Sequence, residues 1–345
     1  MSKILNFFLK FFTIIIITAL SAELISYILL KFDSTELFQI RNFTEKVNDK
    51  RVFTLKRNFS ENINKQWSVI SSNERLRISK YDVKTSNYLS ESNFDEKFLF
   101  LGDSVPFGWG VNAEESLPYL FQKYNKDLVV LNAALPSYSL AQSVERYEKE
   151  FKNLKSLKFI FLQIYDPVEQ YSILGINWNV DDNWANHSKQ VLRPYNLIDI
   201  KLPFYGEPLF YDYFKKKLYR IKRKKLKESP YDDKSDYKFV SHINSSLNKI
   251  NNLIKDKKIF FIISSTVINN SAINNLSKSH LRTLKMQNKN LKEFSERNKN
   301  VYYFDVSSQL NLDPKKTFID LCCHLSDKGA DLVAKELTKL ITKLD

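Results

Sequence analysis

The chain has 345 residues, of which 43% are apolar and 14% are aromatic. This composition excludes a disordered chain, and the length is sufficient for one large domain with extensions. The formal net charge of +14 invites a nucleic-acid or anionic-membrane interpretation, but lysine is abundant everywhere and no nucleic-acid-binding module is recognisable. We therefore expect no nucleic-acid partner.

The sequence gives little support for disulfide or metal chemistry. Its only cysteines, Cys322 and Cys323, are neighbours and cannot connect distant segments. The histidines show no spacing typical of zinc ligands; they are His187, His242, His280 and His324. We expect neither a metal nor a cofactor.

Residues 1–31 contain an apolar run over 11–30 that is long enough to cross a membrane as a helix. Its one charged residue, Glu23, lies towards one end. A cleavable signal peptide is the rival interpretation, because residues 19–21 resemble a small-residue cleavage site. The apolar run continues to Leu30, which favours an uncleaved single-pass anchor. The flanking basic residues are nearly balanced and favour neither orientation strongly.

Residues 32–95 are polar and irregular, with strand-like pieces at 52–56 and 67–70. Aromatic residues are interspersed throughout, which argues against a disordered spacer. We expect an extension whose short strands pack against the following domain, and nothing in it suggests catalysis.

Residues 97–111 are the most informative stretch of the chain. An apolar run typical of a buried parallel strand ends in Gly102-Asp103-Ser104, and three of the six glycines of the chain fall within 102–110. Such clustering indicates a tight turn or a close approach of the backbone. A serine at the carboxyl end of a buried strand sits where open α/β sheets bind their ligands, although serine is also a common helix cap.

The stretch FLFLGDSVPFGWGV resembles the first block of the SGNH (GDSL) hydrolases, in which Gly-Asp-Ser supplies the nucleophile. The resemblance covers residues 96–345. It implies a flavodoxin-like three-layer α/β/α domain that acts on acyl esters, with Ser104 as the nucleophile. Asp103 is interpreted as structural.

The second block follows an expected helix over 114–124 and an expected strand over 127–132. Residues 132–139 resemble the family pattern Asn-x-Gly-x-Pro-Gly-Tyr-Ser, with Ala134 and Ser137 in place of the two glycines. Ala134 falls on the glycine whose backbone N–H contributes to the oxyanion hole. The resemblance therefore implies that the backbone N–H groups of Ser104 and Ala134 hold the oxyanion, provided that φ at Ala134 suits a Cβ atom.

The third block departs from the family. A strand expected over 158–165 runs into Asp166, and the pattern Gly-x-Asn-Asp retains only this aspartate. Loss of the asparagine donor typically costs about 10²- to 10³-fold in rate. The Tyr165 hydroxyl is an alternative oxyanion donor, but it reaches several ångströms further. This departure is the main argument against a fast esterase.

Residues 170–236 form an insertion that is rich in aromatic residues and contains a very basic segment at 215–227. This segment is either a cap that touches anionic lipid or glycan, or a solvated helix face, the commoner case. His187 lies in the insertion without an acidic partner in a recognisable pattern, and we expect it at the surface.

Two further strands are expected at 258–265 and 301–306, with helices at 240–255 and 281–297. Five apolar strands alternating with helices predict a doubly wound parallel sheet in the order 2-1-3-4-5. His280 lies near the start of the second helix, where a structural role is expected.

Residues 318–329 resemble the fifth family block, Asp-x-x-His followed by Leu-Ser/Thr-x-x-Gly, and lead into an amphipathic C-terminal helix. Here Asp320 precedes His324 by four residues instead of three. In a helix the two side chains would share a face, whereas in an extended segment they would point apart. The resemblance implies that His324 acts as the base and that Asp320 orients its imidazole.

The sequence thus predicts a membrane-anchored SGNH-type serine hydrolase that cleaves an acyl ester, in first place an acetyl ester, of a glycan or a lipid, with its domain outside the cytoplasm. Two alternatives stay open. The same site could transfer the acyl group to an envelope glycan, or the protein could be an inactive member that binds glycan or scaffolds a membrane complex.

Overall fold

A computed structural model describes residues 2–32, 40, 42–47, 49, 51, 53–63, 67–80, 96–136, 138–163, 233–255, 257–265, 268–271 and 278–344. Ser137, Tyr165, Asp166, His187 and residues 170–232 of the predicted insertion lie outside this part. The chain divides into two compact units. The described part of the first consists mainly of helix α1 (Ser2–Phe32), and the second begins at Phe43.

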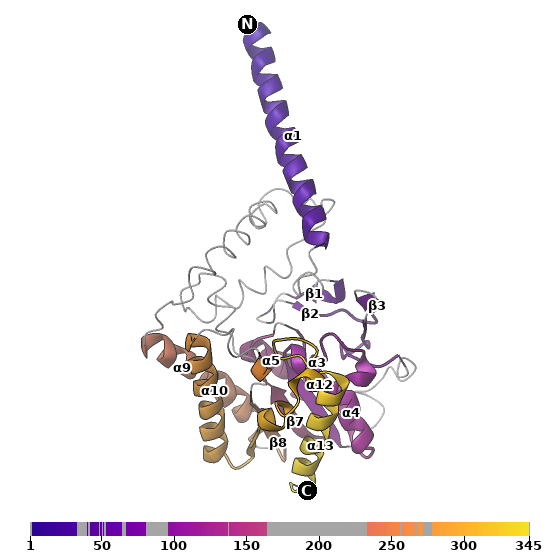
Figure 1. Cartoon of the computed structure of the whole chain (residues 1–345), viewed down its shortest axis with the longest axis vertical. Helices are drawn as coiled ribbons and strands as arrows, with labels where there is room; N and C mark the ends of the chain where they lie inside the picture. The colour runs from indigo at the N-terminus through magenta and orange to yellow at the C-terminus, as the bar shows by residue number, and fades with distance from the viewer. Residues whose placement is uncertain are drawn as a thin grey trace. The chain divides into compact units, whose positions relative to one another are not determined.

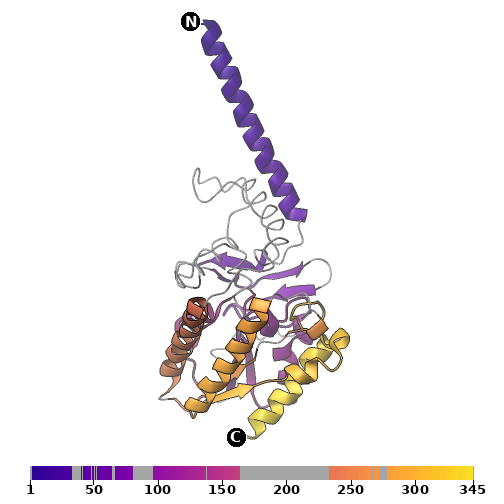
Figure 2. The same ribbon diagram turned by 60° about the vertical axis from the view of Figure 1, so that its left-hand side comes forward.

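The second unit is built on a five-stranded parallel sheet. Its strands are adjacent in the order β6-β5-β7-β8-β9, which confirms the predicted order 2-1-3-4-5. Figures 1 and 2 show the unit in two views. Their bounds are β5 (Lys97–Gly102), β6 (Val129–Asn132), β7 (Leu157–Gln163), β8 (Phe260–Ser264) and β9 (Val301–Phe304).

Helices cover both faces of this sheet, which confirms the three-layer α/β/α prediction. Because side chains alternate along a strand, Phe98 and Phe100 of β5 pack on one face while Leu99 and Leu101 pack on the other. The first face is covered by α4 (Leu117–Tyr124) and α13 (Asp327–Thr342). The second is covered by α5 (Leu140–Arg146), α9 (Asp233–Ile254) and α10 (Lys278–Arg297).

Several element bounds differ from the sequence predictions. The helix expected over 114–124 is divided by Ser116 into a short 3₁₀ turn and α4. Helix α9 begins at Asp233, inside the predicted insertion. The remaining short elements are α3 (Ser104–Phe107), η1 (Ala113–Glu115), η2 (Tyr147–Phe151), α11 (Ser307–Leu310) and α12 (Pro314–Thr317).

The extension forms two antiparallel strand pairs, β1 (Thr44–Lys46) with β2 (Phe53–Leu55) and β3 (Ser60–Ile63) with β4 (Trp67–Ile70). Polar contacts join these strands to the sheet unit: the Tyr138 hydroxyl donates to the carbonyl of Phe53, and the Gln142 amide donates to the Arg51 carbonyl at 2.7 Å. The described part of the extension, residues 43–47, 49, 51, 53–63 and 67–80, is therefore packed onto the domain and is not a free spacer.

Helix α1 contains one apolar span, Asn6–Ile25, of 20 residues with a mean hydropathy of 2.0. Its large apolar side chains are exposed, as with Phe7, Ile14 and Ile25. Length and composition permit this helix to cross a membrane, and a signal sequence would show the same features.

Candidate active site

Ser104 lies at the carboxyl end of the central strand β5 and opens the short helix α3. The preceding residue, Asp103, caps this helix, because its carboxylate accepts a hydrogen bond from the Val105 N–H at 3.1 Å. The Asp103 side chain is thus engaged with backbone, as expected for a structural role. Ser104 itself is 7% exposed. We call residues 103–111 the Ser104 loop.

Two glycines give the Ser104 loop its path. Gly102 has φ of 128°, and a Cβ atom there would lie 2.4 Å from the carbonyl oxygen of Gln163 on β7. Gly108 has φ of 82°, and a Cβ atom there would lie 2.5 Å from Ser116. Glycine is required at both positions, since the backbone approaches its neighbours too closely for any side chain.

His324 lies in a second loop, residues 318–326, which we call the His324 loop. An isolated bridge between Phe318 and Leu325 closes it, and α13 begins only at Asp327. The segment from Asp320 to His324 is therefore not helical. The two side chains nevertheless meet, in a turn that is neither the helix nor the extended segment considered from the sequence.

The local reason is the Asp320 carboxylate, which organises the loop around itself. Its Oδ1 atom accepts hydrogen bonds from the backbone N–H groups of Cys322 at 2.9 Å, Cys323 at 3.1 Å and His324 at 3.3 Å. These bonds curl the chain back on the carboxylate. The other oxygen, Oδ2, is then left 2.5 Å from Nδ1 of His324.

The structure brings Ser104, His324 and Asp320 into one hydrogen-bonded series. The Ser104 Oγ lies 2.9 Å from His324 Nε2, although 220 residues separate them. The His324 side chain is 7% exposed and that of Asp320 is 38% exposed. Burial opposes ionisation of Asp320, but hydrogen bonds from the imidazole and the loop N–H groups outweigh it, so the pKa of this carboxyl is lowered. Asp320 is thus a carboxylate at neutral pH.

Asn269 supports the His324 loop and was not singled out by sequence reasoning. Its side-chain amide donates to the Asp320 carbonyl at 2.9 Å, and its own N–H donates to the Cys322 carbonyl at 2.9 Å. Asn269 is buried and follows β8, so the sheet anchors the loop. No pattern in the sequence links this asparagine to the site. Within the loop, Cys322 and Cys323 form a disulfide between neighbours, which connects no distant segments.

The expected oxyanion donors are placed differently from one another. The backbone N–H of Ala134 donates to Oδ1 of the buried Asn132 at 3.2 Å. Ala134 is not among the residues with positive φ, so its Cβ atom is accommodated. The backbone N–H of Ser104 lies in the first turn of α3 and belongs to the same residue as the nucleophilic hydroxyl. Tyr165 lies outside the described residues.

The Ser104 loop and the His324 loop carry three apolar side chains of note. The ring of Trp109 lies 6.2 Å from the His324 ring, centroid to centroid. Ile319 packs over Gly110 and is 44% exposed, while Leu321 is 66% exposed. We call Trp109, Ile319 and Leu321 the apolar rim.

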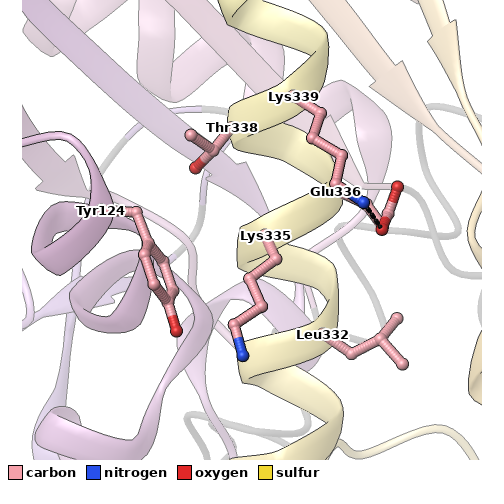
Figure 3. A pocket seen from close by; sticks show the side chains of 6 residues that line it. All are labelled: Tyr124, Leu332, Lys335, Glu336, Thr338 and Lys339. Carbon is pink, nitrogen blue, oxygen red and sulfur yellow. Dashed lines mark hydrogen bonds and ion pairs between the residues drawn. The ribbon is translucent and has the colours of Figure 1, made fainter.

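Other chemistry finds no comparable arrangement in the described part of the chain. No group of three histidine, cysteine or acidic side chains that could hold a metal ion occurs among these residues. A pocket of about 240 Å³ lies between α4 and α13 (Figure 3). Its lining residues on α13 lie about 8 to 18 Å along that helix from its start. The lining contains none of Ser104, His324 and Asp320. The lining residues are Tyr124, Leu332, Lys335, Glu336, Thr338 and Lys339.

Comparisons with known proteins give the following. No family model and no curated protein matches the sequence. Among solved structures, a lipolytic G-D-S-L family protein from Veillonella parvula shares 13% identity over 72% of this chain and 98% of its own, with a TM-score of 0.43. A psychrotrophic esterase from Pseudoalteromonas has 13% identity over 72% and 98%, with a TM-score of 0.45. A GDSL-like lipase from Bacteroides thetaiotaomicron has 12% identity over 77% and 98%, with a TM-score of 0.44.

Proposed function

We propose that this chain is a serine hydrolase of the SGNH type that cleaves an acyl ester. The observation that carries the proposal is the 2.9 Å contact between Ser104 Oγ and His324 Nε2, backed by the 2.5 Å contact between His324 Nδ1 and Asp320. A nucleophile, a base in hydrogen-bond reach and a carboxylate that orients the base are the parts that acyl transfer through serine requires.

In the first half of the reaction, Ser104 Oγ attacks the ester carbonyl carbon while its proton passes to Nε2 of His324. Asp320 fixes the proton on Nδ1, so that Nε2 is free to accept, and stabilises the imidazolium that forms. The tetrahedral intermediate then collapses. The bond to the leaving alcohol breaks, and the alcohol takes the proton from Nε2, which leaves an acyl group on Ser104.

In the second half, His324 takes a proton from water, and the resulting hydroxide attacks the acyl carbon. Collapse breaks the bond between the acyl carbon and Ser104 Oγ, which takes the proton back from Nε2 of His324, and the carboxylic acid is released. The backbone N–H groups of Ser104 and Ala134 are the proposed oxyanion donors. The bond from Ala134 to Asn132 is long at 3.2 Å, and this N–H must turn partly from Asn132 to the oxyanion.

The apolar rim supports a neutral acyl substrate, because exposed leucine and isoleucine side chains gain free energy when a substrate covers them. A short ester such as an acetyl ester is the first substrate to test. A glycan or a lipid would carry it. Transfer of the acyl group to a sugar hydroxyl uses the same acyl-enzyme and differs only in the group that attacks it.

The test is labelling with a fluorophosphonate probe together with hydrolysis of nitrophenyl acetate. We expect the wild-type protein to be labelled at Ser104, and both signals to fall by at least about 10³-fold in Ser104→Ala and His324→Ala. Labelling without hydrolysis, but with acetyl transfer to an added sugar, would identify a transferase instead.

A matched control is Ser265→Ala. Ser265 is also a buried serine at the carboxyl end of a sheet strand, and its hydroxyl lies 2.8 Å from Asp305, but no histidine partner is recorded for it in the described part of the chain. This variant should be labelled like the wild type. If the wild type is not labelled, or if Ser104→Ala is labelled equally well, the hydrolase proposal fails.

We further propose that α1 anchors the domain in a membrane, with the domain outside the cytoplasm. The 20-residue apolar span supports this, since about 20 residues of helix cross the hydrocarbon core. The intact mass of the mature protein separates the anchor from a signal sequence, which would be lost by cleavage near residue 21. An anchored protein should resist alkaline extraction of membranes, and protease added from the outer side should reach the domain.

A further inference from the structure

The backbone carbonyls that follow Ser104 are bound by two buried side chains. The last carbonyl groups of the short helix α3 have no N–H partner within the helix, as at any helix C-terminus. Asn132, at the end of β6, donates through its side-chain amide to the carbonyls of Pro106 and Phe107, both at 3.3 Å. The second side chain, Arg77, comes from the extension.

The Arg77 guanidinium makes three hydrogen bonds to carbonyl oxygens of the Ser104 loop. Its Nη1 donates to the carbonyl of Phe107 and to that of Gly108 at 2.6 Å, and its Nη2 donates to that of Val111 at 2.6 Å. Its backbone N–H donates to the Asn132 carbonyl at 3.0 Å, which fixes Arg77 against the end of β6. One planar guanidinium therefore joins three points along the loop that presents Ser104.

The surroundings of Arg77 make this arrangement rigid. The residue is 4% exposed, and its guanidinium lies 4.5 Å from the Phe107 ring and 5.5 Å from the Trp67 ring. Burial lowers the pKa of this guanidinium to about 9, so it stays protonated at neutral pH. Glu114 and Glu115 favour the charged form of Arg77 from beyond ion-pair distance, and no carboxylate of the described residues forms an ion pair with it. The Arg77 guanidinium therefore depends mainly on its carbonyl and ring partners, and a displacement of the loop would remove hydrogen bonds from a buried cation.

A second set of contacts runs in parallel from the extension to the site. Phe43 stacks on Phe107 with ring centroids 5.6 Å apart, and Trp67 meets Trp109 edge to face at 5.0 Å. Trp109 in turn lies beside His324. The extension thus contacts the loop that carries Ser104, and one of the rings it contacts, Trp109, lies beside His324.

We propose that Arg77 is a positioning residue that holds the Ser104 loop against β6, so that the described part of the extension contributes to the active site. The proposal rests on the proposed function in one respect, that Ser104 is the nucleophile. Lysine cannot replace Arg77, because a single ammonium cannot reach three carbonyls spread along the loop.

The experiment compares Arg77→Lys with Arg51→Lys. Arg51 is also a buried arginine of the extension, 7% exposed, and it pairs with Asp49 at 2.7 Å and with Glu150 of η2. It ties the extension to the domain without a recorded contact to the Ser104 loop. Any general loss of stability should therefore appear in both variants, whereas a positioning effect should appear only at Arg77.

Hydrogen exchange of peptides covering residues 104–111 gives a readout that does not need activity. The N–H groups of Gly108 and Trp109, which donate to the Ser104 carbonyl, should exchange at least about 10-fold faster in Arg77→Lys and at the wild-type rate in Arg51→Lys. The rate of fluorophosphonate labelling should fall about 10- to 100-fold in Arg77→Lys alone, since small misplacements of a nucleophile have effects of this size.

Unchanged exchange and labelling in Arg77→Lys, or equal losses in both variants, would overturn the positioning role. If the wild type is not labelled, the hydrolase proposal fails, and the exchange data still decide whether Arg77 holds the loop. If Arg77→Lys does not fold, Arg77→Gln, which buries no charge, takes its place with the same two readouts and the same expected outcome.

Discussion

The Ser104 loop and the His324 loop are joined by the hydrogen bond between Ser104 and His324 but are stabilised in opposite ways. The Ser104 loop is buried, and its carbonyls are bound by Arg77 and Asn132, which lie far from it in the sequence. The His324 loop is partly exposed and is organised from within, because the Asp320 carboxylate accepts three N–H groups of the next four residues.

This difference shows that the nucleophile and the base are positioned by different kinds of contact. The nucleophile is fixed by tertiary contacts to other elements, so its place depends on the extension and on β6. The base is fixed mainly by a local turn, with one external support from Asn269. The following predictions test this difference, beginning with the largest effect.

Asp320 serves both the loop and the imidazole, and two substitutions separate these roles. In Asp320→Asn the side-chain oxygen can still accept the loop N–H groups, but the charge that stabilises the imidazolium is gone. We expect hydrolysis to fall by about 10²- to 10⁴-fold, with a smaller drop in the unfolding temperature than in Asp320→Ala. Asp320→Ala should lose activity to the same extent and should also speed hydrogen exchange over residues 318–326.

The measurements are ester hydrolysis, thermal unfolding and hydrogen exchange on the same samples. A Ser265→Ala control reports any general effect of removing a polar side chain at this end of the sheet. Equal exchange in Asp320→Asn and Asp320→Ala would show that the carboxylate does not organise the loop, and the contrast between the two loops would be lost.

The close approach of β5 to β7 predicts a large effect on stability at Gly102. Alanine there would place Cβ 2.4 Å from the backbone oxygen of Gln163, and its φ of 128° is one that residues with a side chain rarely adopt. Because β5 and β7 are hydrogen-bonded in the sheet, neither strand can move away without a large cost in free energy. We expect Gly102→Ala to reduce the free energy of unfolding by about 3 kcal/mol or more. Gly110→Ala is the matched control. Its φ is similar to that of Gly108, but its Cβ would meet only the flexible end of Ile319, and about 1 kcal/mol is expected.

Denaturant unfolding of the two glycine variants measures this difference. Similar losses at both positions would mean that the strand contact behind Ser104 is more adjustable than its geometry indicates, and that the nucleophile is not tightly fixed by the sheet.

Acid should loosen the His324 loop before the Ser104 loop. The pKa of Asp320 is lowered in the folded protein, so its contribution to stability is complete above the unfolded value of about 3.9 and is lost as the pH falls through the folded value. The difference in unfolding free energy between wild type and Asp320→Asn should therefore shrink as the pH falls below about 4.

Arg77→Lys provides the comparison for the other loop, because arginine and lysine both keep their charge in acid. Its difference from wild type should be the same at pH 7 and pH 3. A difference for Asp320→Asn that does not change with pH would show that the carboxylate contributes nothing as an anion.

The sequence alone predicted the sheet and the residues that meet at its edge. Apolar runs of strand length alternating with amphipathic helices specify a doubly wound sheet, and the Gly102–Ser104 turn and the residues around His324 carried recognisable local patterns. These features are local, because periodicity and turn chemistry act over a few residues.

Tertiary structure decided the rest. That Asp320 reaches His324 without a helix depends on three backbone hydrogen bonds and on Asn269, none of which leaves a pattern in the sequence. The role of Arg77 could not be foreseen either, since a charged residue in a polar segment is normally a surface residue. Only folding reveals which carbonyls lack partners and which distant side chain is buried against them, because those contacts join parts of the chain that composition and spacing treat as independent.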